Sequence, residues 1–290
     1  MSFVKSTGII EFANFQKSAE YVIYTPRDSI PRAVVQIVHG FNETVESYEE
    51  CGFVDTLTFH GFVVCGLKLR GFGEDNKVEL GNLSVISDDI ASFFTHLRKT
   101  YRRLPFILFG HDLGSLLVRD YMVSGYSSVD GVILSGTWNN TGKLRSEKLK
   151  TKLDILLRGK DFIGYYSDKK IFGHNRDQNV KFTYTCASYL NSIQLLERVS
   201  APEWAGNVPL SLPVLLVSGE DDVLEKDGNG PSYVHSLLFD AELCELQLKK
   251  YEGCGHAPHY SSCRDTAFTD VCSWIDDVCQ GVVDWGTLKI

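Results

Sequence analysis

The sequence predicts an α/β fold in which a mostly parallel sheet is covered by helices on both faces. Short apolar runs rich in β-branched residues alternate with longer segments that repeat apolar residues at helical spacing. Several of the short runs are almost wholly apolar, which is typical of strands buried on both faces of a parallel sheet. The alternation itself favours parallel strands joined by right-handed crossovers.

Seven runs are expected to form strands, and we expect about eight strands in the complete sheet. The runs are residues 21–24, 33–39, 62–69, 106–110, 131–135, 214–218 and 244–251. Helices are expected where apolar residues recur every three or four positions, around 85–101, 116–122 and 268–275.

The alternation stops between residues 137 and 208, where aromatic and basic residues mix with glycine and asparagine and strand runs are absent. Pro202, Pro209 and Pro213 mark the end of this segment. We interpret residues 137–208 as a cap inserted into a core made of residues 1–136 and 209–290. The cap is expected over the carboxyl ends of the strands, where open α/β sheets bind ligands.

Composition and charge argue against several function classes. The net charge of the 290 residues is −8 and the basic residues are scattered, so no nucleic-acid partner is expected. No apolar run approaches the roughly 20 residues of a membrane helix, and none follows the first residues as in an export signal. We therefore expect a cytoplasmic protein without integral membrane association. The eight cysteines are then expected to be free and mostly buried thiols. No CxxC pair occurs, so a zinc site is not expected, and no metal or cofactor is predicted.

One motif carries most of the functional information. Residues 106–115 read F-I-L-F-G-H-D-L-G-S, an apolar strand that passes through Gly-His-Asp-Leu-Gly into a helical pattern. The small residues Gly110 and Gly114 permit a strained strand-to-helix turn that exposes the central side chain, Asp112. An ordinary glycine-rich turn is the alternative interpretation.

Three further stretches complete a hydrolase pattern. Residues 214–222 (V-L-L-V-S-G-E-D-D) form a strand that ends in carboxylates, and residues 251–256 (Y-E-G-C-G-H) place a histidine in a loop. Residues 37–43 (I-V-H-G-F-N-E) form the turn after an early strand, where an oxyanion hole is usually built. The order along the chain, nucleophile, then acid, then histidine, is that of hydrolases with such an elbow.

Together these stretches resemble the lysophospholipase and monoacylglycerol lipase branch of the α/β-hydrolases. The resemblance rests on V-H-G-F-N-E at 38–43, L-R-G-F-G at 69–73, G-H-D-L-G-S at 110–115, V-D-G-V-I-L-S-G-T at 129–137, L-P-V-L-L-V-S-G-E-D-D-V at 212–223 and K-K-Y-E-G-C-G-H at 249–256. It covers nearly all of the core and little of the cap. It implies an α/β-hydrolase fold with an inserted cap.

The resemblance also implies roles for particular residues. Asp112 occupies the nucleophile position, Asp222 the acid position and His256 the position of the catalytic histidine. The backbone N–H groups of Phe41 and Leu113 match the oxyanion hole, whose two donors point at the charge that develops during reaction.

Neighbouring residues leave alternatives open for the acid and the base. Asp221 stands beside Asp222 and is a second candidate for the acid, although the family spacing favours Asp222. His259 follows His256 by three residues and is either a second functional group or a loop histidine.

Other polar residues near the motifs are interpreted as structural. His39 is expected to hold the oxyanion turn by hydrogen bonding, His111 to support the elbow, and Arg70 to fix a loop near that turn. Phe72 and Ala257 stand where the family commonly has histidine and glutamate. Such departures suit either a changed or a lost activity.

The main departure is Asp112, which stands where the family has its nucleophilic serine. A carboxylate that attacks an ester would form a mixed anhydride and expel a far more basic alkoxide, so ordinary lipase chemistry should be poor. Three interpretations remain: an aspartate nucleophile that forms an alkyl ester, as in epoxide hydrolases; a non-catalytic relative that binds an apolar ligand, with Asp112 capping a helix; and a serine lipase carrying an introduced substitution. Dehalogenases resemble the elbow but have tryptophan where Leu113 stands, which argues against a halide leaving group.

The first interpretation needs acidic hydroxyl groups above the nucleophile, which in epoxide hydrolases are usually cap tyrosines. The candidates are Tyr165, Tyr166, Tyr184 and Tyr189, and the alternative for each is an aromatic residue of the cap interior. The resemblance implies a small-to-medium apolar or acyl-chain substrate. It also allows a transient contact of the cap with a membrane surface, and it leaves the oligomeric state open.

Overall fold

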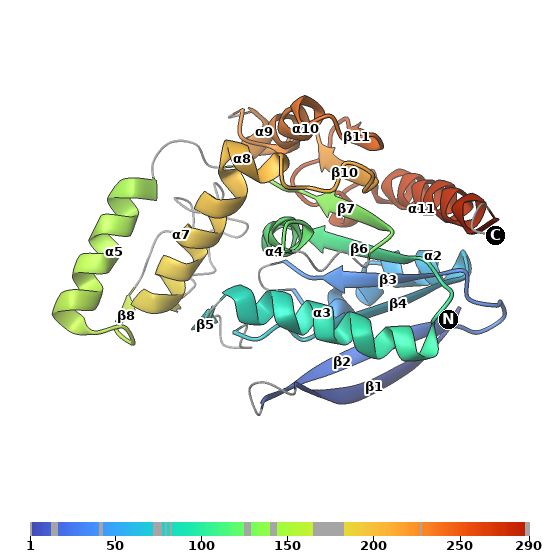
Figure 1. Ribbon diagram of the computed structural model, residues 1–290, viewed down its shortest axis with the longest axis horizontal. Helices are drawn as coiled ribbons and strands as arrows, with labels where there is room; N and C mark the ends of the chain where they lie inside the picture. Colours follow the sequence, from blue (N-terminus) through green and yellow to red (C-terminus); the bar gives the residue numbers. More distant parts are fainter. Residues whose placement is uncertain are drawn as a thin grey trace.

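An eight-stranded sheet forms the centre of the protein (Figure 1). The computed structural model of the chain describes residues 2–12, 17–40, 43–71, 77–78, 80–81, 83–124, 129–139, 144–164, 183–226 and 228–287. Within these ranges, no helix combines the length and the apolar character that crossing a membrane would require.

The strand order of the large sheet is β1-β2-β4-β3-β6-β7-β10-β11. The strands are β1 (Phe3–Phe12), β2 (Lys17–Pro26), β3 (Ala33–Val38), β4 (Phe62–Leu67), β6 (Phe106–His111), β7 (Gly131–Ser135), β10 (Val214–Gly219) and β11 (Leu246–Tyr251). Strand β2 pairs antiparallel with β1 and β4, and all other neighbours are parallel. This topology confirms the predicted α/β-hydrolase fold with its mostly parallel eight-stranded sheet.

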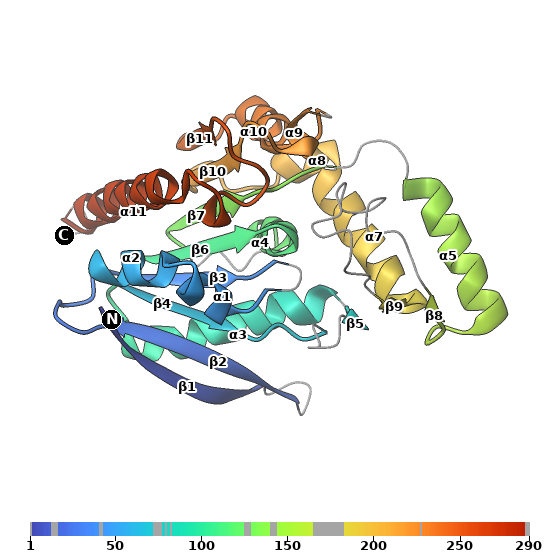
Figure 2. The ribbon, with the colours of Figure 1, turned by 180° about the vertical axis from the view of Figure 1, so that it is seen from behind.

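Helices pack on both faces of this sheet. They are α1 (Val45–Glu50), α2 (Phe53–Phe59), α3 (Leu83–Thr100), α4 (Leu113–Met122), α9 (Val223–Lys226), α10 (Pro231–Asp240), the short 3-10 helix η1 (Pro258–Tyr260) and α11 (Arg264–Thr287). Figure 1 shows α3 and α4 in front of the sheet, and the opposite view in Figure 2 shows α1 and α2 in front. Successive side chains of a strand point to opposite faces of the sheet. In β3, Val34 therefore packs in one apolar cluster and Val35 in the other.

One strand of the large sheet was not predicted from the sequence. In β1, only Phe3, Ile10 and Phe12 are buried, because the strand lies at the edge of the sheet and pairs only with β2. An edge strand with few buried residues lacks the apolar run that marks the inner strands. Two predicted runs were also too long at their ends, since β3 ends at Val38 and β4 at Leu67.

The predicted cap segment lies between β7 and β10. It contains α5 (Leu144–Arg158), β8 (Ile163–Gly164), β9 (Thr183–Thr185), α7 (Cys186–Ser200) and α8 (Pro202–Ala205). Helices α5 and α7 extend beyond the end of the large sheet in both views (Figures 1 and 2). The assignment of this segment as a cap stays a prediction.

The expectation that this segment has no strands was wrong. Strand β9 pairs antiparallel with β8 and parallel with β5 (Lys77–Val78), which belongs to the first part of the chain. Strands of two or three residues are too short to leave a period in the sequence, so their pairing could not be read from it.

Arg119 on α4 joins the core to this segment. Its fully buried guanidinium donates to the carbonyl of Trp138 and to Asn139 Oδ1, both at 2.7 Å, and to the carbonyl of Val199 on α7. It also lies over the ring of Trp204 at 4.3 Å, and the indole N–H donates back to the Arg119 carbonyl. Burial lowers the pKa of Arg119 to about 9. A single charged side chain therefore connects α4, the end of β7, α7 and α8.

The expectation of free thiols fails for one pair of cysteines. Cys254 and Cys263 form a disulfide, because the chain turns back through η1 and brings their α-carbons to 6.4 Å. This turn could not be recognised from a spacing of nine residues. The other six remain thiols, of which Cys65, Cys186 and Cys272 are buried and Cys244 is exposed.

Candidate active site

Asp112 lies at a strained turn between β6 and α4. Its φ of 51° and ψ of −125° fall in a region that non-glycine residues rarely adopt, and such strain collects at functional sites. The turn needs small neighbours, because a β-carbon on Gly110 would lie 2.7 Å from the Gly114 carbonyl oxygen. One on Gly114 would lie 2.0 Å from the carbonyl oxygen of Val38. The geometry is the elbow that the sequence predicted, and not an ordinary glycine-rich turn.

The structure brings the three predicted triad residues together. His256, in the loop after β11, has Nε2 at 3.3 Å from Asp112 Oδ1 and Nδ1 at 2.8 Å from Asp222 Oδ2. Asp222, in the loop after β10, also accepts from the backbone N–H of Leu224 at 2.9 Å. Both carboxylates are almost fully buried, whereas the His256 side chain keeps 11% of its surface exposed. The three loops lie at the carboxyl ends of β6, β10 and β11, where such sheets bind ligands.

The two carboxylates favour a protonated His256. Burial lowers the pKa of His256 and is the largest single influence. The hydrogen bonds and charges of Asp112 and Asp222 together outweigh it, and they raise the pKa above its ordinary value. The arrangement can therefore hold a proton at Nε2, beside the Asp112 carboxylate.

The side chain of Asp112 does not cap α4, since it makes no capping hydrogen bond to the first turn of that helix. It contacts His256 instead. This geometry does not support the interpretation of Asp112 as a helix cap.

The expected oxyanion turn lies directly beside Asp112. A β-carbon on Gly40 would stand 3.1 Å from Asp112 Oδ2, so the turn after β3 approaches this oxygen closely. Leu113, the first residue of α4, is fully buried at the elbow, and helix N-termini present backbone N–H groups. Phe41, the other predicted donor, lies outside the described residues.

His39 and Arg70 have the structural roles that the sequence predicted. The buried His39 ring contacts the Gly40 carbonyl at 3.0 Å through Nδ1 and accepts from the Leu69 N–H at 3.4 Å through Nε2. Burial, the largest influence, lowers its pKa, so it is neutral at pH 7. Arg70 forms a two-pronged ion pair with Asp89 on α3, which fixes the loop after β4.

The structure distinguishes the two candidates for the acid and places two of the four candidate tyrosines. Asp221 is exposed and pairs with Lys226 at 2.8 Å, while Asp222 contacts His256, so the geometry favours Asp222 as the acid. Tyr184 and Tyr189 are fully buried with ring centroids 5.6 Å apart, as expected of interior aromatics. Tyr165 and Tyr166 lie outside the described residues.

One residue at the site had no role in the sequence analysis. Glu43 is buried behind the oxyanion turn, where Oε2 accepts from the Gly40 N–H at 2.9 Å and from the Tyr48 hydroxyl at 2.6 Å. The sequence contains it within V-H-G-F-N-E, but nothing in that motif shows which atoms its carboxylate meets. His111 and His259 lie next to it, at 3.8 and 3.6 Å from Oε1.

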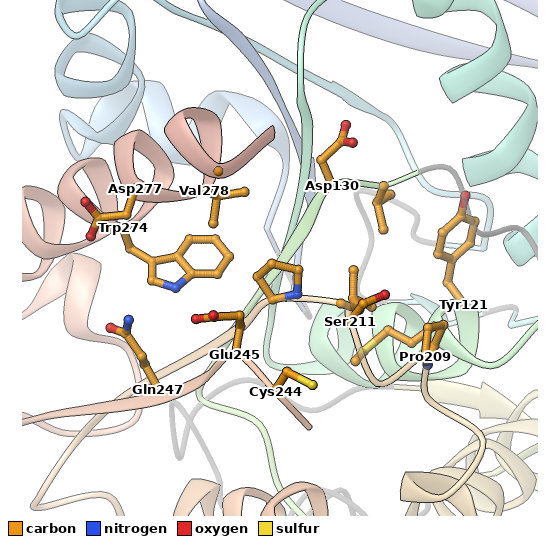
Figure 3. A pocket seen from close by; sticks show the side chains of 15 residues that line it. Tyr121, Asp130, Pro209, Ser211, Cys244, Glu245, Gln247, Trp274, Asp277 and Val278 are labelled. Atoms are coloured by element: carbon orange, nitrogen blue, oxygen red, sulfur yellow. The ribbon is translucent and has the colours of Figure 1, made fainter. Parts of the chain in front are cut away.

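A groove of about 990 Å³ lies elsewhere, at the amino ends of β7, β10 and β11 (Figure 3). Pro213, Glu245 and Trp274 are among the described residues that line it, and the triad residues are not. Ligands of open α/β sheets bind at the carboxyl ends of the strands, so we assign the candidate active site to the triad and not to this groove.

Comparison with known proteins places the chain among hydrolases. A family profile described as serine aminopeptidase, S33 matches residues 29–261. Monoglyceride lipase of Rattus norvegicus is 26% identical over 260 residues, which cover 81% of this chain and 79% of that protein. Monoglyceride lipase of Mus musculus is 25% identical over 281 residues, which cover 87% and 85%.

Solved structures share the fold. A thermostable carboxyl esterase from Bacillus coagulans has a TM-score of 0.80 at 21% identity and covers 95% of this chain and 99% of its own. A soluble variant of monoglyceride lipase from Saccharomyces cerevisiae, with a substrate analogue, has a TM-score of 0.69 at 17% identity and covers 95% and 97%. At these identities the likeness shows the fold alone.

Proposed function

Because the chain belongs to the serine aminopeptidase, S33 family of α/β-hydrolases, we propose that it hydrolyses a small-to-medium, lipid-like substrate with Asp112 as the nucleophile. The observation that carries the proposal is the continuous contact from Asp112 through His256 to Asp222 at a strained elbow. A carboxylate expels an ester alkoxide poorly, so the substrate class that fits has an electrophilic sp³ carbon bonded to oxygen, as an epoxide does.

In the first step, an oxygen of Asp112 bonds to the substrate carbon. The carbon–oxygen bond of the epoxide breaks, and its electron pair goes to the epoxide oxygen. Protonated His256 donates its Nε2 proton to that oxygen, and the raised pKa of His256 supports this role as acid. The product is a hydroxyalkyl ester on Asp112 and a neutral His256, which can accept a proton in the next step.

In the second step, a water attacks the carboxyl carbon of the ester while neutral His256 accepts one of its protons. The acyl–oxygen bond then breaks, and the alcohol leaves with the other proton of the water. Asp112 returns as a carboxylate that carries one oxygen from water, and His256 is protonated again. Asp222 keeps the imidazole oriented and stabilises its charge through both steps.

The backbone N–H groups of Phe41 and Leu113 would hold the second carboxyl oxygen of Asp112. That oxygen stays fixed while the first one attacks the substrate, and it becomes the oxyanion when water adds to the ester. The closeness of Asp112 Oδ2 to Gly40 supports this role.

Helix α5 supports presentation of the substrate at a lipid surface. Leu149, Leu153, Leu156 and Leu157 are all more than half exposed. These leucines lie on neighbouring turns of one face of the helix, and Lys150 and Lys152 are exposed beside them. An exposed apolar stripe flanked by basic residues is typical of helices that lie on a membrane surface.

The proposal is tested by intact-protein mass spectrometry after incubation with panels of apolar epoxides and esters. His256→Ala removes the proton donor of the first step and the water-activating base of the second, so an epoxide should react more slowly but accumulate as one covalent adduct, mapped to Asp112. Turnover of the unaltered protein in ¹⁸O-water should label the Asp112 carboxylate. The Asp221→Asn variant is the matched control, because its side chain is exposed and does not contact His256.

Absence of both an adduct and turnover with every epoxide would contradict the nucleophile role. Saturable binding of the same apolar compounds without turnover would then favour the alternative function, a relative that binds its ligand without reaction. Ester hydrolysis in ¹⁸O-water that leaves no ¹⁸O in Asp112 would also contradict the role of Asp112 as nucleophile.

A further inference from the structure

A second cluster of ligand-type side chains is buried behind the oxyanion turn. Glu43 follows β3, His111 ends β6, and His259 lies in η1. All three are buried, and one possible ligand atom from each lies within 4.8 Å of the other two. The Nε2 atoms of His111 and His259 face the same oxygen, Glu43 Oε1, at 3.8 and 3.6 Å.

These separations are longer than hydrogen bonds but suit atoms that share one ion. Hydrogen bonds to nitrogen have lengths of about 2.7–3.2 Å. In a tetrahedral zinc site with metal–nitrogen bonds of about 2.0–2.1 Å, neighbouring ligand atoms lie about 3.3 Å apart. We propose that Glu43, His111 and His259 bind a divalent transition-metal ion such as Zn²⁺.

His259 gives the independent support for a ligand. The residue is only 4% exposed, and neither ring nitrogen makes a hydrogen bond within the described part of the chain. Its ring stacks on Tyr48, with centroids 5.1 Å apart and planes at 17°, and this packing fixes its orientation. A buried polar group without a hydrogen bond destabilises the fold, and a metal bond would remove this cost.

The surrounding contacts orient the other two ligands. Glu43 Oε2 is bonded to the Gly40 N–H and the Tyr48 hydroxyl, so Oε1 faces the histidines. His111 Nδ1 contacts Ser135 Oγ at 3.0 Å, which leaves Nε2 toward Glu43. Metal-binding side chains typically form such hydrogen bonds through the oxygen or nitrogen that does not bind the ion. Two imidazole nitrogens and one carboxylate favour zinc and its neighbours over magnesium or calcium.

The ion would connect three of the segments that form the candidate active site. Glu43 is bonded to the oxyanion turn, His111 precedes Asp112, and His259 follows His256 by three residues. Because the ligands meet only in the folded chain, binding should stabilise the native state.

The test is calorimetric titration of the metal-depleted full chain with Zn²⁺, together with thermal unfolding. We expect one ion per chain and a rise in Tm. Glu43→Gln and His259→Gln should each weaken binding at least about tenfold and abolish the rise in Tm. His235→Gln, which changes a histidine on α10, is the matched control and should bind as the unaltered protein does.

Three results would overturn the proposal. One is no binding of Zn²⁺, and another is unchanged affinity in both Glu43→Gln and His259→Gln. The third is loss of binding in His256→Ala or Cys244→Ser while His259→Gln retains it, since the ion would then sit at the triad or at an exposed thiol. If the variants fail to fold, anomalous diffraction from zinc-soaked crystals of the unaltered protein decides. A peak among the three side chains supports the site, and peaks only elsewhere reject it.

Discussion

A β-carbon on Gly40 would stand 2.9 Å from the β-carbon of Asp112, so the turn after β3 packs directly on the elbow. It would also stand 2.9 Å from Glu43 Oε2, which accepts the Gly40 N–H. Gly40→Ala must therefore displace Asp112, Glu43 or the turn itself. We expect the rate of adduct formation on Asp112 to fall at least about a hundredfold, since small misplacements of reacting groups cost this much.

Gly81→Ala is the matched control for this prediction, because a β-carbon there meets no described atom within 4 Å. Circular dichroism should show that both variants keep their secondary structure. Unchanged adduct formation in a folded Gly40→Ala variant would contradict the close packing of the turn on the elbow.

The pKa of His256 should depend on Asp112. The hydrogen bond and charge of Asp112 help to raise this pKa above its ordinary value of about 6.5. Asp112→Asn should therefore lower the pKa, as followed by NMR titration of the His256 ring. Asp221→Asn, which alters an exposed carboxylate paired with Lys226, should leave it unchanged.

The same shift makes stability depend on pH. Because the pKa of His256 is higher in the folded than in the unfolded state, protonated His256 stabilises the fold. This stabilisation is complete below the unfolded-state pKa and is lost as the pH rises through the folded-state pKa. The free energy of unfolding should thus fall over that interval in the unaltered protein, and fall less in Asp112→Asn. Denaturant unfolding at several pH values measures it, and identical profiles would contradict the coupling.

Residues with a strong local pattern were predicted well from the sequence. The inner strands are apolar runs because both of their faces are buried, and the elbow is marked by Gly110, Asp112 and Gly114. The resemblance of the motifs to those of the hydrolase branch also led us to expect Asp112, Asp222 and His256 at one site. The edge strand β1 and the pairing of β5 with β9 were missed, because neither leaves a run of buried residues.

The cluster of Glu43, His111 and His259 could not be predicted for a different reason. Its members come from three segments that are far apart in the sequence, and the sequence pattern places each one separately, in a turn, an elbow or a loop. Metal-ligand spacing is recognisable in a sequence when ligands are close along the chain, as in CxxC pairs. Here the sheet brings them together, so only the fold reveals the group.

Arg119 should contribute strongly to stability. Replacing it with methionine keeps much of the apolar stem but leaves the carbonyls of Trp138 and Val199 and the Asn139 side chain without this donor. We expect a loss of about 3 kcal/mol or more in the free energy of unfolding, at about 1–3 kcal/mol for each unsatisfied group. Arg264→Met is the control, because both side chains of its ion pair with Asp265 are more than half exposed, and such a pair should be worth less than about 1 kcal/mol. Equal losses in the two variants would contradict the connecting role of Arg119.

The exposed leucines of α5 should control binding to lipid vesicles. Leu149→Ser with Leu156→Ser removes apolar surface from the proposed contact without opening the core, because both side chains are more than two-thirds exposed. Vesicle binding, measured by co-sedimentation with anionic vesicles, should fall at least about tenfold. Leu210→Ser, a half-exposed leucine outside α5, should bind as the unaltered protein does. Equal binding by all three proteins would contradict a lipid contact through α5.

Asp112→Ser should exchange one hydrolase chemistry for another. A serine hydroxyl at the elbow could pass its proton to His256, and it would form an acyl ester that the retained Asp222–His256 pair can hydrolyse. With one carboxylate fewer beside it, His256 should have a lower pKa and act more readily as a base at pH 7. We expect short-chain ester hydrolysis at least about a hundredfold above that of Asp112→Ala, with loss of the epoxide adduct. If Asp112→Ser instead hydrolyses no ester while its fold and Tm are preserved, then the oxyanion donors or the substrate pocket, and not the aspartate alone, have departed from the lipase pattern.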